Sequence, residues 1–82
     1  MMTYLITCDL HNSRKNHSQL VGALQHKGAK RILFSTWALQ TESSAAQIRN
    51  GILQFLDPND RIVIAAIGEH ASHNPMAEVP HL

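Results

Sequence analysis

A run of six apolar residues, from Ile62 to Ile67, constrains the fold of this chain more than any other feature of the sequence. Such a run is typical of a strand that is covered on both faces, because a strand with one wet face alternates between apolar and polar residues. We therefore expect residues 61–67 to form a central strand of a sheet. The chain has only 82 residues, enough for one small domain with little material to cover two faces.

Residue types at the start of the chain predict a strand and then a helix. Residues 3–8 are mostly β-branched or aromatic, and the strand they predict stops at Asp9, before an exposed polar loop. Ser18 is a candidate N-cap for a short amphipathic helix over residues 19–27. Gly28 is the residue type that commonly ends a helix, because it adopts left-handed backbone angles without strain.

The middle of the chain contains an extended segment and a well-marked helix. Residues 30–41 are either one long strand or a hairpin that turns near Ser35. Ser44 and Gln47 match a capping box, in which each side chain satisfies a backbone N–H at the start of a helix. The next apolar residues have helical spacing and predict a core-facing stripe: Ile48, Ile52 and Phe55. Residues 57–60 have the composition of a turn.

The order of these elements predicts an α+β fold. If residues 30–41 form a hairpin, the order is βαββαβ, a ferredoxin-like sandwich with an antiparallel sheet and two helices on one face. Residues 1–68 would form this domain, and residues 69–82 an irregular or partner-dependent tail. The helices would leave the second face of the 61–67 strand uncovered. We therefore expect a second copy to cover it, giving a homodimer.

Composition limits the functional classes. The formal net charge of +1 indicates no global attraction to nucleic acid or to a membrane. Apolar runs of six residues fall far below the ~20 needed to cross a bilayer, and the N-terminus lacks the basic start of a signal peptide. The single cysteine, Cys8, excludes an intramolecular disulfide and suits a reducing compartment. We expect a cytoplasmic protein without a membrane segment.

The residues from Met2 to Gly68 resemble a known group. The first strand ends in Asp9, the block Ser35-Thr36-Trp37 lies in an extended region, and a helix starts within residues 41–49. This pattern resembles the SinR-like small bacterial and phage proteins, which in turn resemble the second CRISPR-associated protein of spacer acquisition and the VapD-type toxins. The resemblance implies a ferredoxin-like fold and a homodimer joined across sheet faces. It also implies, as in some members, metal-dependent cleavage of RNA or DNA centred on the first-strand aspartate.

Asp9 is the candidate catalytic and metal-binding residue. A carboxylate at a strand end can bind Mg²⁺, and one from each copy could meet across a dimer axis. The alternative is that Asp9 caps the polar loop that follows it. Four basic residues are candidate phosphate contacts for nucleic acid: Arg14, Lys15, Lys30 and Arg31.

The leading functional hypothesis is a nucleic-acid-associated dimer that acts as a Mg²⁺-dependent endonuclease on RNA or DNA. The alternative is a non-catalytic dimeric module that binds a protein partner or a small nucleotide, which the near-neutral charge favours. His70 and His73, together with Glu69 and His81, could ligate zinc, although an exposed polar tail accounts for them as well. Phe34 and Trp37 could stack a base, but such a pair is more often core or interface. Cys8 has the features of a buried, unreactive thiol.

Overall fold

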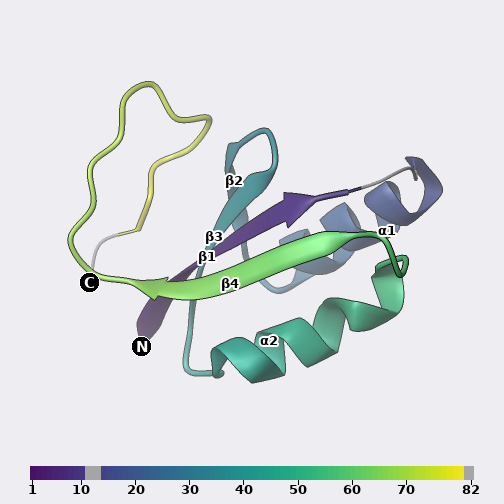
Figure 1. Cartoon of the computed structure of the whole chain (residues 1–82). Helices are drawn as coiled ribbons and strands as arrows, with labels where there is room; N and C mark the ends of the chain where they lie inside the picture. Colours follow the sequence, from purple (N-terminus) through teal and green to yellow (C-terminus); the bar gives the residue numbers. More distant parts are fainter. Residues whose placement is uncertain (11–13, 81–82) are drawn as a thin grey trace.

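The computed structural model describes residues 1–10 and 14–80, and it describes residues 14–17 by their backbone only. Figure 1 shows a sheet with helices packed against it and an irregular C-terminal segment. The elements in chain order are β1 (Met2–Asp9), α1 (Arg14–His26), β2 (Lys30–Leu33), β3 (Thr36–Thr41), α2 (Ala45–Ile52), the 3-10 turn η1 (Leu53–Phe55) and β4 (Arg61–Ile67).

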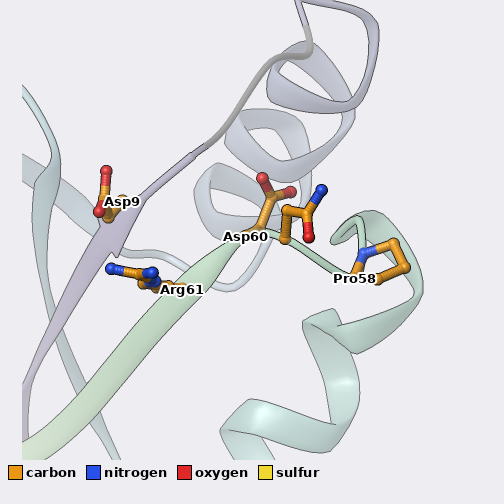
Figure 2. A pocket seen from close by; sticks show the side chains of 5 residues that line it. Asp9, Pro58, Asp60 and Arg61 are labelled. Carbon is orange, nitrogen blue, oxygen red and sulfur yellow. The ribbon is translucent and has the colours of Figure 1, made fainter.

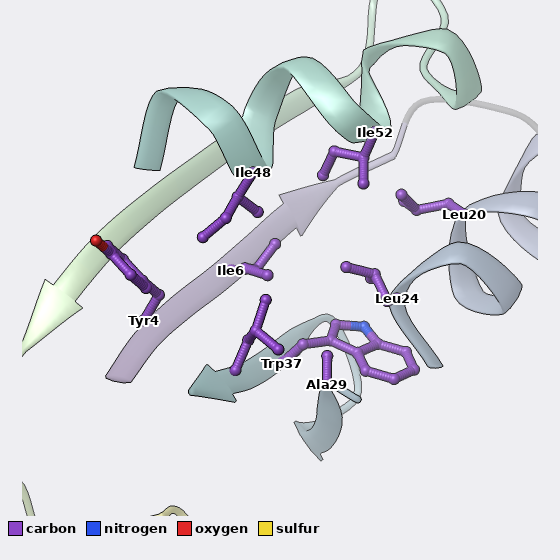
Figure 3. Close-up of a cluster of buried hydrophobic side chains, with 9 residues drawn as sticks. Tyr4, Ile6, Leu20, Leu24, Ala29, Trp37, Ile48 and Ile52 are labelled. Atoms are coloured by element: carbon purple, nitrogen blue, oxygen red, sulfur yellow. The ribbon is translucent and has the colours of Figure 1, made fainter. Parts of the chain in front are cut away.

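The strands form one four-stranded sheet in the order β2-β3-β1-β4, and every neighbouring pair is antiparallel. The described residues therefore form an α+β fold with two α-helices, which is compatible with a ferredoxin-like arrangement. Both helices contribute to one buried cluster with the sheet, so both cover the same face. The members labelled in Figure 3 are Tyr4, Ile6, Leu20, Leu24, Ala29, Trp37, Ile48 and Ile52.

The extended segment 30–41 is a hairpin. Phe34 and Ser35 form the two-residue turn between β2 and β3, so the predicted turn near Ser35 is confirmed and the single long strand is wrong. Cys8 N–H of β1 donates to Ser35 C=O over 3.0 Å. The tip of the hairpin is therefore fixed beside the end of β1.

The predicted capping box is present at the start of α2. Ser44 Oγ accepts from the Gln47 backbone N–H at 3.1 Å, and Gln47 Oε1 accepts from the Ser44 N–H at 2.8 Å. Ile48 and Ile52 are buried as the apolar stripe predicts. Phe55 is half-buried and lies in η1, just after the α-helix ends.

Two sequence predictions about α1 have different outcomes. The start predicted at Ser18 is wrong, because the helix begins at Arg14. Arg and Lys have good helix propensity, so a polar first turn can be helical without an apolar stripe to mark it. Gly28 has φ of 91°, which confirms that the chain leaves the helix through a left-handed glycine.

The prediction that residues 61–67 form a central strand is wrong, because β4 is an edge strand bonded only to β1 among the described strands. Ile62 and Ile64 pack against the main cluster under the helices. Val63, on the other face, is 61% exposed. An apolar run indicates that the two faces of a strand can be covered. It does not indicate how many strands bond to its edges, which decides whether the strand is central or at the edge of the sheet.

The C-terminal segment lies against the face opposite the helices (Figure 1). Residues 69–80 contain no helix or strand. Val79 is buried with Ile32 and Ala38 in a second, smaller cluster, and Met76 N–H donates to Ile32 C=O over 2.8 Å. The chain thus covers part of its own second face, and the domain boundary at residue 68 stays a prediction. Within residues 1–10 and 14–80, no helix has the length and apolar character to cross a bilayer.

Candidate functional site

Asp9 lies at the paired ends of β1 and β4, directly opposite Arg61 in the sheet register. Residues opposite each other in an antiparallel pair have Cβ atoms about 4.5–5.5 Å apart, so the carboxylate and the guanidinium can influence one another. Figure 2 shows both side chains at this strand end, next to the turn that precedes β4. The turn and the strand ends surround an open hollow of about 490 Å³, lined by Asp9, Pro58, Asn59, Asp60 and Arg61.

The turn that carries Asp60 is fixed by its own hydrogen bonds. Asp57 N–H donates to Asp60 Oδ2 at 2.8 Å, and Asp60 N–H donates to Asp57 C=O at 2.9 Å. These bonds confirm the turn predicted over residues 57–60. They also occupy one carboxylate oxygen of Asp60.

Strand alternation places Asp9 on the open face of the sheet. In β1, Tyr4 and Ile6 are buried in the main cluster and Cys8 packs against it, so these residues face the helices. The intervening residues, including Thr7 and Asp9, point to the opposite face, because successive strand residues alternate. Arg61, paired with Asp9, lies on that same open face.

Cys8 faces the helices, and Asp60, in the turn before β4, lies close enough to affect its thiol. Burial raises the pKa of the Cys8 thiol, and the negative charge of Asp60 raises it further. A raised pKa disfavours the thiolate, which is the reactive form of cysteine. The half-buried thiol therefore has the unreactive character that the sequence indicates.

Metal ions need sets of ligands, which limits where the described residues could hold one. Across residues 1–10 and 14–80, no group of three or more His, Cys, Asp or Glu side chains could hold a metal ion. Mg²⁺ is often bound through one or two carboxylates while it keeps several waters. Asp9 fits that pattern, since its hard oxygen donors are exposed at an open hollow.

The four predicted phosphate contacts lie in different places. The backbones of Arg14 and Lys15 begin α1, and their side chains fall outside the described part of the chain. Lys30 lines a hollow of about 360 Å³ with Met1 and Lys27, at the end of β1 opposite to Asp9. The structure therefore does not bring Lys30 together with Asp9.

Arg31 is half-buried and held between two aromatic rings. Its guanidinium carbon lies 4.9 Å from the Trp37 ring centroid and 5.8 Å from that of Phe34. Trp37 is 4% exposed, so the core alternative is correct for this residue, whereas Phe34 is 76% exposed. The side chains of Arg31 and Phe34 therefore pack against each other at the hairpin tip.

The tail histidines line a different hollow. His70 and His73 border an opening of about 270 Å³ between the C-terminal segment and the open sheet face, along with apolar residues such as Leu5. They belong to no metal-binding group among the described residues, and His81 lies outside them.

Sequence reasoning missed Asp60 and Arg61 as neighbours of Asp9. The signal was present, because an antiparallel β1–β4 pair brings the end of the first strand to the start of the last. A search of the chain against protein-family models finds no match.

Proposed function

We propose that this chain is a cytoplasmic, nucleic-acid-associated protein of the SinR-like group, with a ferredoxin-like fold, that acts as a homodimer. Asp9 of each copy holds Mg²⁺ for endonucleolytic cleavage of RNA or DNA. The observation that carries the proposal is the position of Asp9 at an exposed strand end, on the open face of the sheet and opposite Arg61. The strand order, the resemblance and the single cysteine support the fold and the compartment.

The open face supports pairing through this side of the sheet. Val63 is 61% exposed, and its neighbours Thr7 and Ala65 are exposed as well. The C-terminal segment covers only the part of the face near Ile32 and Val79. A second copy that covers the remainder would place the two Asp9 residues at one interface. A stable pair would have to bury upwards of ~1,200 Å² in total.

The residues have separable roles in this proposal. Asp9 supplies hard oxygen ligands, while Arg61, across the register, is placed to contact a phosphate and offset its charge. Asp60 remains with its own turn, where it accepts the Asp57 N–H. A bound Mg²⁺ supplies charge stabilisation and a more acidic water for phosphodiester hydrolysis.

The second candidate is a non-catalytic dimeric module that binds a protein partner or a small nucleotide. One observation favours it: the middle of β4 presents the exposed apolar residues Val63 and Ala65 on the open face. This candidate requires the same fold and the same dimer. It differs in predicting that no cleavage depends on Asp9.

The test measures cleavage of labelled single-stranded and duplex RNA and DNA, with Mg²⁺ and with chelator. Asp9→Asn should abolish cleavage and leave the fold intact, because it removes the charged ligand without changing the size of the side chain. Glu42→Gln is the matched control, since it neutralises an exposed carboxylate next to the far end of β3. Loss of Arg14 and Lys15 together should weaken binding and flatten its salt dependence, because each phosphate contact releases counterions.

Cleavage that survives chelator or Asp9→Asn would contradict the metal role. Without cleavage or salt-sensitive binding on any substrate, the partner-binding module would be the better account. Light scattering separates the dimer from the chemistry: wild type should show twice the chain mass of 9.1 kDa, and Val63→Asp should show one chain mass.

A further inference from the structure

The turn of the β2–β3 hairpin carries a side chain that turn chemistry does not explain. Two-residue hairpin turns favour Asn, Gly and Asp, whereas this turn consists of Phe34 and Ser35. The Phe34 side chain is 76% exposed. A large aromatic ring left mostly in water at a turn gains little from burial, so burial in the core does not account for it.

The Phe34 ring is held on a cation. The Arg31 guanidinium lies over the ring at 5.8 Å from its centroid and over the Trp37 ring at 4.9 Å. Trp37 is buried in the core, so the stack of indole, guanidinium and phenyl ring is anchored at its inner end. Arg31 packs against one face of the Phe34 ring, and the high exposure of the side chain leaves the other face open to solvent.

This stack lies at the same end of the sheet as Asp9. Cys8 N–H, one residue before Asp9, donates to Ser35 C=O, one residue after Phe34. Thr36 at the start of β3 pairs with Thr7, and the two hydroxyls lie 3.4 Å apart. Arg31 and Trp37 lie on the helix-covered face, whereas Asp9 and Arg61 lie on the open face. A strand of nucleic acid with a phosphate near Asp9 and Arg61 would therefore reach Phe34 by passing around the hairpin tip.

We infer that Phe34, supported by Arg31, is a stacking platform for an unpaired base, so that the protein selects single-stranded nucleic acid. The inference rests on the proposed function and names its substrate class. Every base has a π-face that an aromatic side chain can bind, and in a duplex those faces are covered by neighbouring base pairs. The positive charge beneath the ring adds attraction to the phosphate backbone.

A protein partner is the competing occupant of Phe34. Docking surfaces for proteins are contiguous apolar patches, usually of several hundred square ångströms. The neighbouring exposed apolar residue, Leu33, instead lines the hollow beneath the C-terminal segment, with Ile67 and Val79. An isolated ring on a guanidinium fits a base better than it fits an apolar protein surface.

The experiment measures the affinity of wild type and variants for fluorescein-labelled 12-nucleotide RNA and DNA strands and for a hairpin duplex. Chelator is present so that no cleavage occurs. Phe34→Ala should weaken binding of the single strands by about 5- to 150-fold, the range for losing one base–aromatic stack, and should leave duplex binding within twofold. Phe34→Leu keeps an apolar side chain without the π-face and should lose nearly as much, whereas Phe34→Trp should bind at least as well as wild type. The matched control is Leu33→Ala, 53% exposed in the same hairpin, which should stay within twofold.

The inference is overturned if Phe34→Leu binds single strands like wild type, if wild type prefers duplex, or if Leu33→Ala loses as much as Phe34→Ala. A change of molecular mass in the Phe34 variants, without loss of single-strand binding, would assign the ring to a protein contact instead. Cleavage that needs Asp9 but is insensitive to Phe34 overturns only this inference. Phe34-dependent binding with cleavage independent of Asp9 overturns only the metal role proposed above, and no nucleic-acid binding at all overturns both.

Discussion

The two faces of the sheet differ in how the chain covers them. The face beneath α1 and α2 carries the main cluster, in which Ile6 and Ile52 have no exposed surface. The other face is covered only in part, by a C-terminal segment that buries Val79, while Val63 stays 61% exposed. The two helices contribute stripes of buried apolar residues to the first face, whereas the C-terminal segment contributes the buried side chain of Val79 to the second. The first face therefore carries the stability, and the second is available for contacts outside the chain.

The largest expected effect is on the helix-covered face. Ile52→Ala should lower the free energy of unfolding by about 2–4 kcal/mol, because it removes buried methylenes and leaves a cavity between α2 and the sheet. Val63→Ala, on the exposed face, should change it by less than about 0.5 kcal/mol in the isolated chain. Urea unfolding at low protein concentration measures both.

The result for Val63→Ala tests whether the two faces really differ in burial. If Val63→Ala costs as much as Ile52→Ala, the open face is buried in solution and a partner copy contributes to the stability. A loss below about 1 kcal/mol for Ile52→Ala would mean that the stripe of α2 does not face a packed core.

An intermediate effect is expected where the C-terminal segment is anchored. Val79→Ala removes two buried carbon groups and should lower the free energy of unfolding by about 1.5 kcal/mol, at about 0.8 kcal/mol per group. Met76→Ala is the control, since its side chain is 62% exposed although its backbone N–H bonds Ile32. Thermal unfolding should separate the two variants. Equal stabilities would show that the segment is not anchored through Val79, and the second face would then be fully open.

The comparison also explains which parts of the fold the sequence predicts. The capping box at Ser44 and the Ile48/Ile52 stripe depend on local hydrogen bonds and helical spacing, so the prediction of α2 is confirmed. The predicted start of α1 at Ser18 and the predicted central position of β4 are wrong. The first turn of α1 carries no apolar stripe, and the apolar run of β4 does not report which strands pair with it. Residues 76–79 cover part of the second face through one buried valine and one backbone hydrogen bond. Neither contact produces a periodic pattern in the sequence, so the sequence could not predict this cover.

The candidate site shows the same limit. Asp9 was singled out from its position after a strand, but its neighbour Arg61 depends on the β1–β4 register. Arg31 was predicted to contact phosphate, and its stacking on Trp37 comes from the pairing of β2 with β3. That Arg61 and Arg31 contact phosphate stays a proposal.

The smallest expected effect concerns Cys8, which reports on the assignment of side chains to the two faces. Burial and then the charge of Asp60 raise the pKa of its thiol. Asp60→Asn should lower that pKa and speed alkylation by iodoacetamide at pH 8, by less than about tenfold, the change for one pKa unit. Asp9→Asn is the control, because Asp9 follows Cys8 directly but points to the open face, and it should leave the rate unchanged.

The same raised pKa gives a pH dependence with a definite sign. The folded state holds the Cys8 proton more tightly than the unfolded chain does, so this contribution to stability is complete below the unfolded thiol pKa of about 8.5. It is lost as pH rises through the higher pKa of the folded state. Cys8→Ala should therefore remove an alkaline loss of stability that wild type shows in urea unfolding between pH 7 and 10.

The alkylation experiment also tests where Asp9 points. Because the chain has a single cysteine, the alkylation signal has one source. If Asp9→Asn speeds alkylation more than Asp60→Asn does, Asp9 has been assigned to the wrong face of the sheet, and it would lie beneath the helices, away from any second copy.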